Sequence, residues 1–259
     1  MSEENPLKTK EKSGLEKVLR PEIKHVIAVA SGKGGVGKSS ITALLAAGAC
    51  KEGFKAGILD ADITGPSIPK MFGLKAAVGG RGFAPAESKL GLKIFSLNLF
   101  LPSEDDPVIW RGPLIGGAIK QFWTDIDWGE LDYLFIDLPP GTADAPLTVM
   151  QIIPLEGLIL VSSPQDLAVM VVKKALKMAG AMNVPVLGLI ENMSYIICPH
   201  CKARTEIFGP SKGEEVSAAT GVPLLATLPL DKKLAEYCDK GEIENYDSPL
   251  FKELLKIYQ

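Results

Sequence analysis

The sequence of 259 residues lacks the features that mark membrane, secreted or nucleic-acid-binding proteins. No apolar run approaches the roughly 18 to 20 residues that a membrane-spanning helix needs. The N-terminus has no apolar segment of the signal-peptide type. The net charge of −3 gives no basic surface for nucleic acid. We therefore expect a cytoplasmic protein that binds neither membranes nor nucleic acid.

Cysteine is scarce, and internal repeats and low-complexity segments are absent. In a reducing compartment the four cysteines are more typical of thiols or metal ligands than of disulfides. The length suits one large α/β core. Residues 1–24, which are rich in Lys and Glu and contain no cysteine, are predicted to form a flexible N-terminal arm. Residues 25–259 are predicted to form one domain.

The most informative stretch is residues 25–40, HVIAVASGKGGVGKSS. Its apolar part predicts a buried strand, and the following residues fit the phosphate-binding pattern G-x-x-x-x-G-K-[ST]. Glycines let backbone N–H groups surround phosphate oxygens, and a helix starting near Lys38 adds the positive end of its dipole. Lys38 is expected to bind the β- and γ-phosphates of ATP, and Ser39 to bind Mg²⁺. The predicted nucleotide-binding residues of this loop are Gly32, Lys33, Gly34, Gly35, Val36, Gly37, Lys38, Ser39 and Ser40.

The second residue of this loop, Lys33, stands where most phosphate loops accept any side chain. GKGGVGKS resembles the deviant loop of the ParA, MinD and nitrogenase iron-protein ATPases. The resemblance implies that Lys33 is catalytic and reaches the phosphates of a partner subunit across a dimer. The alternative interpretation is a solvated surface lysine.

Three aspartates follow predicted buried strands. Asp60 and Asp62 come after residues 55–59, and Asp137 ends the strand predicted at 133–137. Ligands bind at the carboxyl ends of parallel strands. We expect Asp137 to hold Mg²⁺ through water, and one of the first two acids to face the attacking water. The alternative is a set of solvated or capping acids.

The remaining pattern alternates strands and helices, which predicts an α/β fold with a doubly wound, mainly parallel sheet flanked by helices, as in P-loop NTPases of the MinD/ParA type. Asn192, at the end of a predicted strand, is interpreted as a base contact. The last helix could lie on a membrane, although docking on the sheet is the commoner fate. Further strands are predicted at 92–99, 157–162, 186–190 and 224–228, and further helices at 114–125, 164–182, 211–220, 232–240 and 249–258.

Cys198-Pro199-His200-Cys201 is a second candidate site, within a predicted loop at residues 194–205. Two thiolates make half of a metal site, and no second C-x-x-C completes a zinc ribbon. Two chains related by a two-fold axis would supply four thiolates, a set that suits a [4Fe–4S] cluster. Zinc in the same place, a redox pair and an inert pair remain alternatives. Cys50 is interpreted as a core residue and Cys238 as structural.

Taken together, GKGGVGKSS, LDADITGPSIP, VIWRGP, the LFIDLPPGTADAPLT region and VPVLGLIENMSYIICPHC resemble the Mrp/ApbC family of iron–sulfur cluster carrier ATPases. The resemblance implies a homodimer, a labile [4Fe–4S] cluster on Cys198 and Cys201, and transfer to apo iron–sulfur proteins. It assigns Asp62 to water orientation and Asn192 with Pro229 to the adenine surroundings. The chain departs from the family at Ala143, where glycine is more usual.

Two other functions stay open. One is a MinD/ParA-like positioning ATPase, and the other is an ATP-dependent reductase of the nitrogenase type. The cysteine pair Cys198 and Cys201 favours the cluster carrier over both.

Overall fold

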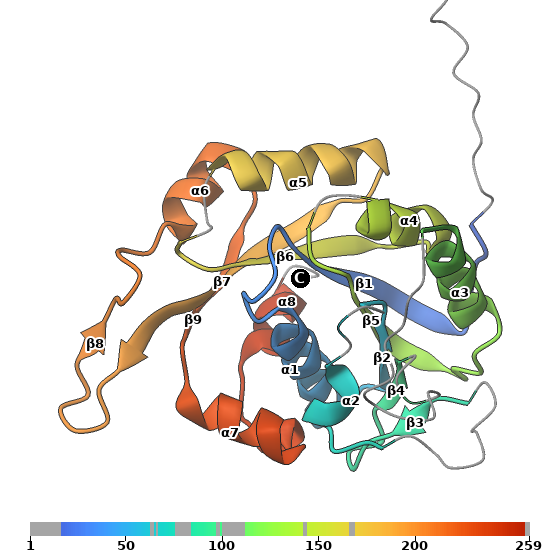
Figure 1. Ribbon diagram of the computed structural model, residues 1–259, viewed down its shortest axis with the longest axis horizontal. Helices are drawn as coiled ribbons and strands as arrows, with labels where there is room; N and C mark the ends of the chain where they lie inside the picture. Colours follow the sequence, from blue (N-terminus) through green and yellow to red (C-terminus); the bar gives the residue numbers. More distant parts are fainter. Residues whose placement is uncertain are drawn as a thin grey trace, which may run out of the picture.

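The computed structural model describes residues 17–62, 65, 67–75, 84–96, 99, 112–141, 144–165 and 169–256. These residues form a mainly parallel sheet with the strand order β3-β4-β2-β5-β1-β6-β7-β8, and β9 pairs with β7 (Figure 1). Only the β3–β4 and β7–β8 pairs among the described strands are antiparallel. Helices flank the sheet, so the predicted fold class is confirmed.

The element bounds are as follows. The strands are β1 (Ile23–Ser31), β2 (Ala56–Asp60), β3 (Ala86–Glu87), β4 (Lys93–Ser96), β5 (Leu131–Asp137), β6 (Gly157–Ser162), β7 (Val186–Ile197), β8 (Arg204–Thr205) and β9 (Leu224–Pro229). The helices are α1 (Lys38–Lys51), α2 (Ile68–Met71), α3 (Gly112–Thr124), α4 (Asp144–Ile152), α5 (Val169–Ala181), α6 (Gly213–Thr220), α7 (Lys232–Lys240) and α8 (Leu250–Leu255), with a 3₁₀-helix at Ile243–Asn245.

Two apolar layers lie on opposite faces of the sheet. Along β1, Val26 and Ala28 belong to one layer and Ile27 and Val29 to the other, because successive side chains of a strand point to opposite faces. Helices α3, α4, α5 and α6 cover the first face, and α1, α2, α7 and α8 cover the second (Figure 1). Strand β1 is therefore buried on both sides, and the loop that follows it lies at an edge of the sheet.

The largest differences between the predicted elements and the structure are two boundaries and one missed helix. Strand β7 was expected to end at residue 190 but runs to Ile197. Helix α5 begins at Val169, five residues after the predicted start at Pro164, and residues 166–168 lie outside the described part. Helix α4 was not predicted, although Pro146 stands in its first turn, where proline is tolerated.

Residues 20–24, which were assigned to the predicted N-terminal arm, belong to the fold. Strand β1 begins at Ile23, and the Arg20 guanidinium donates to the carbonyl oxygens of Trp123 at 2.6 Å, Thr124 at 3.0 Å and Ile126 at 2.9 Å. These carbonyls lie at the C-terminal end of α3, where backbone acceptors have no partner within the helix. The flexible-arm prediction is therefore wrong for residues 20–24, and residues 1–16 lie outside the described part.

The last helix docks on the body of the protein, as expected. Leu250, Phe251 and Leu254 of α8 are buried, and a Cβ atom at Gly48 of α1 would stand 2.7 Å from the Phe251 Cβ. The two helices therefore approach so closely that α1 has no room for a side chain at that point. Within the described residues, no helix combines the length and the apolar character that crossing a membrane requires.

The hydrogen bonds of Arg20 lead to a prediction about the free energy of unfolding. Arg20→Ala should lower the free energy of unfolding by about 2 to 3 kcal/mol, because three carbonyls lose a charged donor whose side chain is only 13% exposed. The matched control is Lys24→Ala, which removes an ion pair to Asp132 from a side chain that is 69% exposed and should therefore cost much less stability than Arg20→Ala. Chemical denaturation of both variants checks this, and equal losses would contradict it.

Candidate functional site

The predicted phosphate loop connects β1 to α1 at the carboxyl edge of the sheet. Gly35 has φ of 81° and Gly37 has φ of 83°, a left-handed conformation that favours glycine. Gly37 immediately precedes α1, which begins at Lys38 as predicted. Residues 32–35 are exposed, including Lys33, whereas Val36 and Lys38 are buried. The loop thus exposes the backbone of residues 32–35 to solvent and keeps the Lys38 side chain buried.

Lys38 lies among carboxylates from two neighbouring strands. Its Nζ is 2.8 Å from Asp137 Oδ2 and 3.8 Å from Asp62 Oδ2. Asp137 ends β5 beside Val29 of β1, and Asp60 ends β2 beside Asp137. The sheet register therefore brings together the acids that the sequence placed at strand ends.

Asp137 has polar contacts with three side chains, namely the Lys38 ammonium and two hydroxyl groups. Ser39 Oγ donates to its Oδ2 at 2.6 Å, and Thr42 Oγ1 donates to its Oδ1 at 2.9 Å. Burial raises the pKa of Asp137, while the Lys38 ammonium and the two hydroxyl donors oppose this rise. The predicted Mg²⁺ residues, Ser39 and Asp137, are therefore in direct contact, and their oxygens are of the type that Mg²⁺ prefers.

A pocket of about 250 Å³ opens beside the loop, between β7, β9 and α7. Asn192 and Pro229, the predicted adenine surroundings, are both in its wall. The Asn192 side-chain amide donates to the Val36 carbonyl at 3.0 Å, so one of its hydrogen bonds holds the phosphate loop itself. The other residues that line the pocket are Gly37, Ser40, Met193, Leu230, Asp231, Leu234, Ala235, Cys238 and Asp239.

The two candidate metal ligands sit at the tip of a β-hairpin. Strand β7 runs up to Cys198, and β8 pairs with it antiparallel, with Ile197 opposite Arg204. The Cys198 N–H donates to the Ala203 carbonyl at 2.9 Å and closes the turn. The expectation of loop-like flanks within residues 194–205 is therefore wrong, because the strand pairing extends to the cysteines.

The chemistry of the hairpin tip suits a metal ligand. Cys201 is exposed and Cys198 is half-buried, and neither forms a disulfide. Hydrogen bonds from the backbone of Cys201 and of His200 hold the pKa of the Cys198 thiol below its usual value. This favours the thiolate, which is the form that binds metals. Throughout the described ranges, no group of three or more His, Cys, Asp or Glu side chains is placed to hold a metal ion.

Comparison with known proteins agrees with this geometry. A family model described as NUBPL iron-transfer P-loop NTPase matches residues 22–259. The chain belongs to this family. Among curated relatives, the iron-sulfur cluster carrier protein of Clostridium perfringens is 48% identical over 241 residues, covering 88% of this chain and 84% of the relative.

Solved structures of nucleotide-binding proteins share the fold of this iron-transfer NTPase. A nucleotide-binding protein from Archaeoglobus fulgidus, solved in complex with ADP, is 46% identical, with a TM-score of 0.79 and coverage of 89% of this chain and 92% of that one. The septum site-determining protein MinD of Pyrococcus horikoshii is 20% identical, with a TM-score of 0.58 and coverage of 90% and 94%. At that identity the MinD likeness concerns the fold alone.

Sequence reasoning missed two polar residues of the NTPase site. Thr42 lies one helical turn after Lys38, and its hydroxyl oxygen also lies 3.1 Å from the Lys38 carbonyl oxygen. Ser96, at the end of β4, donates to Asp60 Oδ2 at 3.1 Å. The spacing of four residues after the lysine could have indicated Thr42, whereas the Ser96 contact depends on strand order. Ala143 lies outside the described residues, and so do residues 63, 64 and 66.

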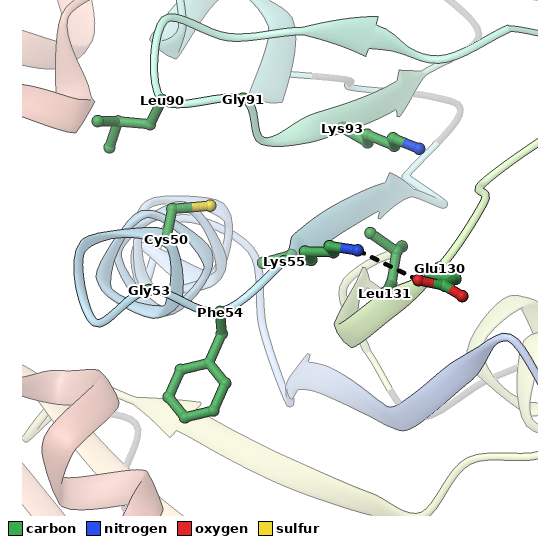
Figure 2. A pocket seen from close by; sticks show the side chains of 10 residues that line it. Cys50, Gly53, Phe54, Lys55, Leu90, Gly91, Lys93, Glu130 and Leu131 are labelled. Atoms are coloured by element: carbon green, nitrogen blue, oxygen red, sulfur yellow. Dashed lines mark hydrogen bonds and ion pairs between the residues drawn. The ribbon is translucent and has the colours of Figure 1, made fainter.

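The other two cysteines lie in different surroundings. Cys238 lines the pocket beside Asn192, and Ser40 hydrogen-bonds its thiol. Cys50 lines a separate pocket of about 490 Å³ with Lys55 and Glu130, and Figure 2 shows its sulfur facing the segment at Leu90. Burial raises the pKa of the Cys50 thiol to about 11, so it stays protonated at neutral pH.

The raised pKa of Asp60 leads to a prediction about how stability depends on pH. Burial, with the Asp137 carboxylate beside it, raises the pKa of Asp60 well above its ordinary value of 3.8. The folded chain therefore binds this proton more tightly than the unfolded chain, and stability falls as pH rises from the unfolded pKa towards the folded one. Asp60→Asn removes that loss, so the variant should gain stability relative to wild type as pH rises.

Denaturation across about pH 4 to pH 8 tests this sign. The control is Asp132→Asn, since a side-chain hydrogen bond from Lys24 lowers the pKa of Asp132. Wild-type Asp132 contributes stability above its unfolded pKa, so its variant should lose stability relative to wild type as pH rises. If both variants change in the same direction, the assignment for Asp60 is wrong.

Proposed function

We propose that this NTPase is an ATP-binding iron–sulfur cluster carrier. It holds a [4Fe–4S] cluster between two copies of the chain, transfers the cluster to apo iron–sulfur proteins, and uses ATP hydrolysis as a switch. The observation that carries the proposal is the presence of a phosphate loop and a two-thiolate hairpin on one sheet. The curated relative named as an iron-sulfur cluster carrier supports the same function.

The nucleotide roles follow from the contacts of the phosphate loop. Backbone N–H groups of residues 32–40 bind the phosphates, and Lys38 supplies the positive charge that neutralises them. Ser39 and Asp137 hold Mg²⁺, Asp137 through water. Asp62 lies 3.8 Å from the Lys38 ammonium and orients the attacking water. Lys33, which is exposed, contacts the phosphates bound to the partner subunit.

The cluster is cargo and needs four thiolates. One chain offers two at the hairpin tip, and the described part of the chain groups no third metal-binding side chain with them. A two-fold axis between hairpins doubles the set, since each ligand is repeated in the partner. Cys198 and Cys201 of both copies then bind the [4Fe–4S] cluster.

The two alternatives account for fewer of these features. A positioning ATPase of the MinD/ParA type shares the fold but gives the cysteine hairpin no role. An ATP-dependent reductase would use the same thiolates for a cluster that stays bound during electron transfer. A carrier releases its cluster, whereas a reductase keeps its cluster bound. Transfer of iron and sulfide to an apo acceptor therefore distinguishes the carrier from the reductase.

The phosphate-loop lysines can be tested separately. Lys38→Ala should abolish nucleotide binding, because Lys38 is the buried cation of the loop. Lys33→Ala should keep most of the binding and lose hydrolysis by about 10³- to 10⁵-fold, if it acts across the dimer as an arginine finger does. Calorimetry and phosphate release measure the two effects. Normal turnover in the Lys33 variant would overturn the role in the partner subunit.

The cysteines give a second test. Cys198→Ala or Cys201→Ala should each abolish cluster binding, because one substitution removes two of the four ligands by symmetry. Cys50→Ala is the matched control and should keep about four irons per dimer. Iron, sulfide and oligomer mass are measured together after anaerobic reconstitution. A full cluster on a monomer, or on the Cys198 variant, would refute the bridging site.

A further inference from the structure

The candidate nucleotide pocket and the cysteine hairpin share strand β7. Asn192 lines the pocket and donates to the Val36 carbonyl of the phosphate loop at 3.0 Å. Cys198 follows directly after Ile197, the last residue of β7. The interval from Asn192 to Cys198 is six residues, or about 20 Å at 3.3 Å per residue of strand. A displacement of the pocket wall therefore has a continuous backbone route to the cysteines.

The part of β7 beside the pocket is irregular. Met193 has φ of 58°, a left-handed conformation that is uncommon for a residue other than glycine. The pairing of β7 with β9 changes register between Glu191 and Tyr195. The Ser194 hydroxyl lies within hydrogen-bond distance of two Glu191 oxygens, the carboxylate Oε2 at 2.9 Å and the carbonyl at 3.1 Å. The regular ladder with β9 is thus interrupted where β7 leaves the pocket, and pairing resumes at Tyr195.

Tyr195 links both sides of the pocket, the side formed by β7 and the side that contains Leu230, to the hairpin. It follows Met193 and Ser194 along β7, and its carbonyl accepts from the N–H of Leu230, which lines the opposite wall, at 2.8 Å. The Arg204 guanidinium carbon lies 3.9 Å from the centre of the Tyr195 ring. Since Arg204 belongs to β8, Tyr195 contacts the second arm of the hairpin as well as forming part of the first.

We propose that Tyr195, clamped by Arg204, is a positioning residue that couples nucleotide occupancy of the pocket to the placement of Cys198 and Cys201. The inference rests on the proposed function, because it takes this pocket as the nucleotide site and the hairpin as the cluster site. Nucleotide binding in the pocket shifts Asn192 and Leu230, which line opposite sides of it, relative to one another. Tyr195 passes that shift to both arms of the hairpin.

The four cysteines provide separate reporters in one experiment. Cys238 lines the pocket and reports nucleotide occupancy, and Cys198 and Cys201 report the hairpin. Cys50 lines the separate pocket of Figure 2 and reports general opening of the fold. The reduced, metal-free full chain is labelled with N-ethylmaleimide at one fixed pH, with and without Mg·ADP. Mass spectrometry then gives a labelling rate for each cysteine.

In the wild type, Mg·ADP should protect Cys238, leave Cys50 unchanged and alter the Cys201 rate by about fivefold or more, within the usual range of coupling between sites. Arg204→Met and Tyr195→Leu should keep the protection of Cys238 and lose most of the change at Cys201. The matched controls, Arg204→Lys and Tyr195→Phe, retain the charge or the ring and should keep the change.

Amide exchange provides a readout that is independent of thiol reactivity. The N–H of Cys198 and the N–H of Lys202 are both hydrogen-bonded within the hairpin turn, the second to the Cys198 carbonyl at 3.0 Å. Mg·ADP should change the exchange of both amides in the wild type and in Arg204→Lys, but not in Arg204→Met. The side chain of Arg204 is 50% exposed, so this variant should fold.

The outcomes separate the inference from the proposed function. If Mg·ADP protects Cys238 but leaves the hairpin unchanged in the wild type, the coupling is refuted while nucleotide binding stands. A hairpin response that persists in Arg204→Met and Tyr195→Leu would equally refute the role of Tyr195. Failure of Mg·ADP to bind, measured by calorimetry, would instead refute the proposed function, and the inference with it.

Discussion

The ammonium of Lys38 is the constraint on which the candidate site depends. It lies 2.8 Å from Asp137 and 3.8 Å from Asp62, where the Asp60 carboxyl is also buried. Ionised carboxylates are costly in such a place unless cations or hydrogen-bond donors compensate them. The carboxyl ends of β2 and β5 can therefore converge on the phosphate loop because one lysine, two hydroxyls of α1 and Ser96 satisfy the acids. The residues that are predicted to bind phosphate therefore also hold the carboxyl ends of these strands together.

The parts of this site that could be predicted from the sequence are those whose cause is local. The phosphate loop is one contiguous stretch, and Asp62 and Asp137 follow apolar strands that bury both faces. Contacts that depend on strand order could not be predicted in this way. Ser96 reaches Asp60 because β4 pairs with β2, and no local pattern encodes that pairing. The fold class was predictable because it needs only the alternation of elements.

Strand β7 shows why element boundaries are harder to predict. Its outer half contains polar residues and Met193 in a left-handed conformation, so the apolar run ends well before the strand does. The strand continues because β9 pairs with it as far as Tyr195, and β8, only two residues long, pairs with its last two residues. Likewise, no local pattern indicates that the Asn192 amide donates to the Val36 carbonyl, a partner 156 residues away in the chain. A side chain at a strand end has several possible partners, and tertiary packing decides among them.

In the proposed function, the buried pair of Lys38 and Asp137 also determines which form of the nucleotide binds. Phosphate oxygens compete with Asp137 for the Lys38 ammonium. When Lys38 turns to the phosphates, Asp137 keeps the hydroxyls of Ser39 and Thr42 as donors but loses its cation, and burial then penalises its charge. Either Asp137 takes up a proton or a cation must enter with the phosphates. The Ser39 hydroxyl lies 2.6 Å from Asp137, so an oxygen pair suited to a divalent cation already stands at that point. The charge balance of the site therefore favours the magnesium complex of the nucleotide over the free nucleotide.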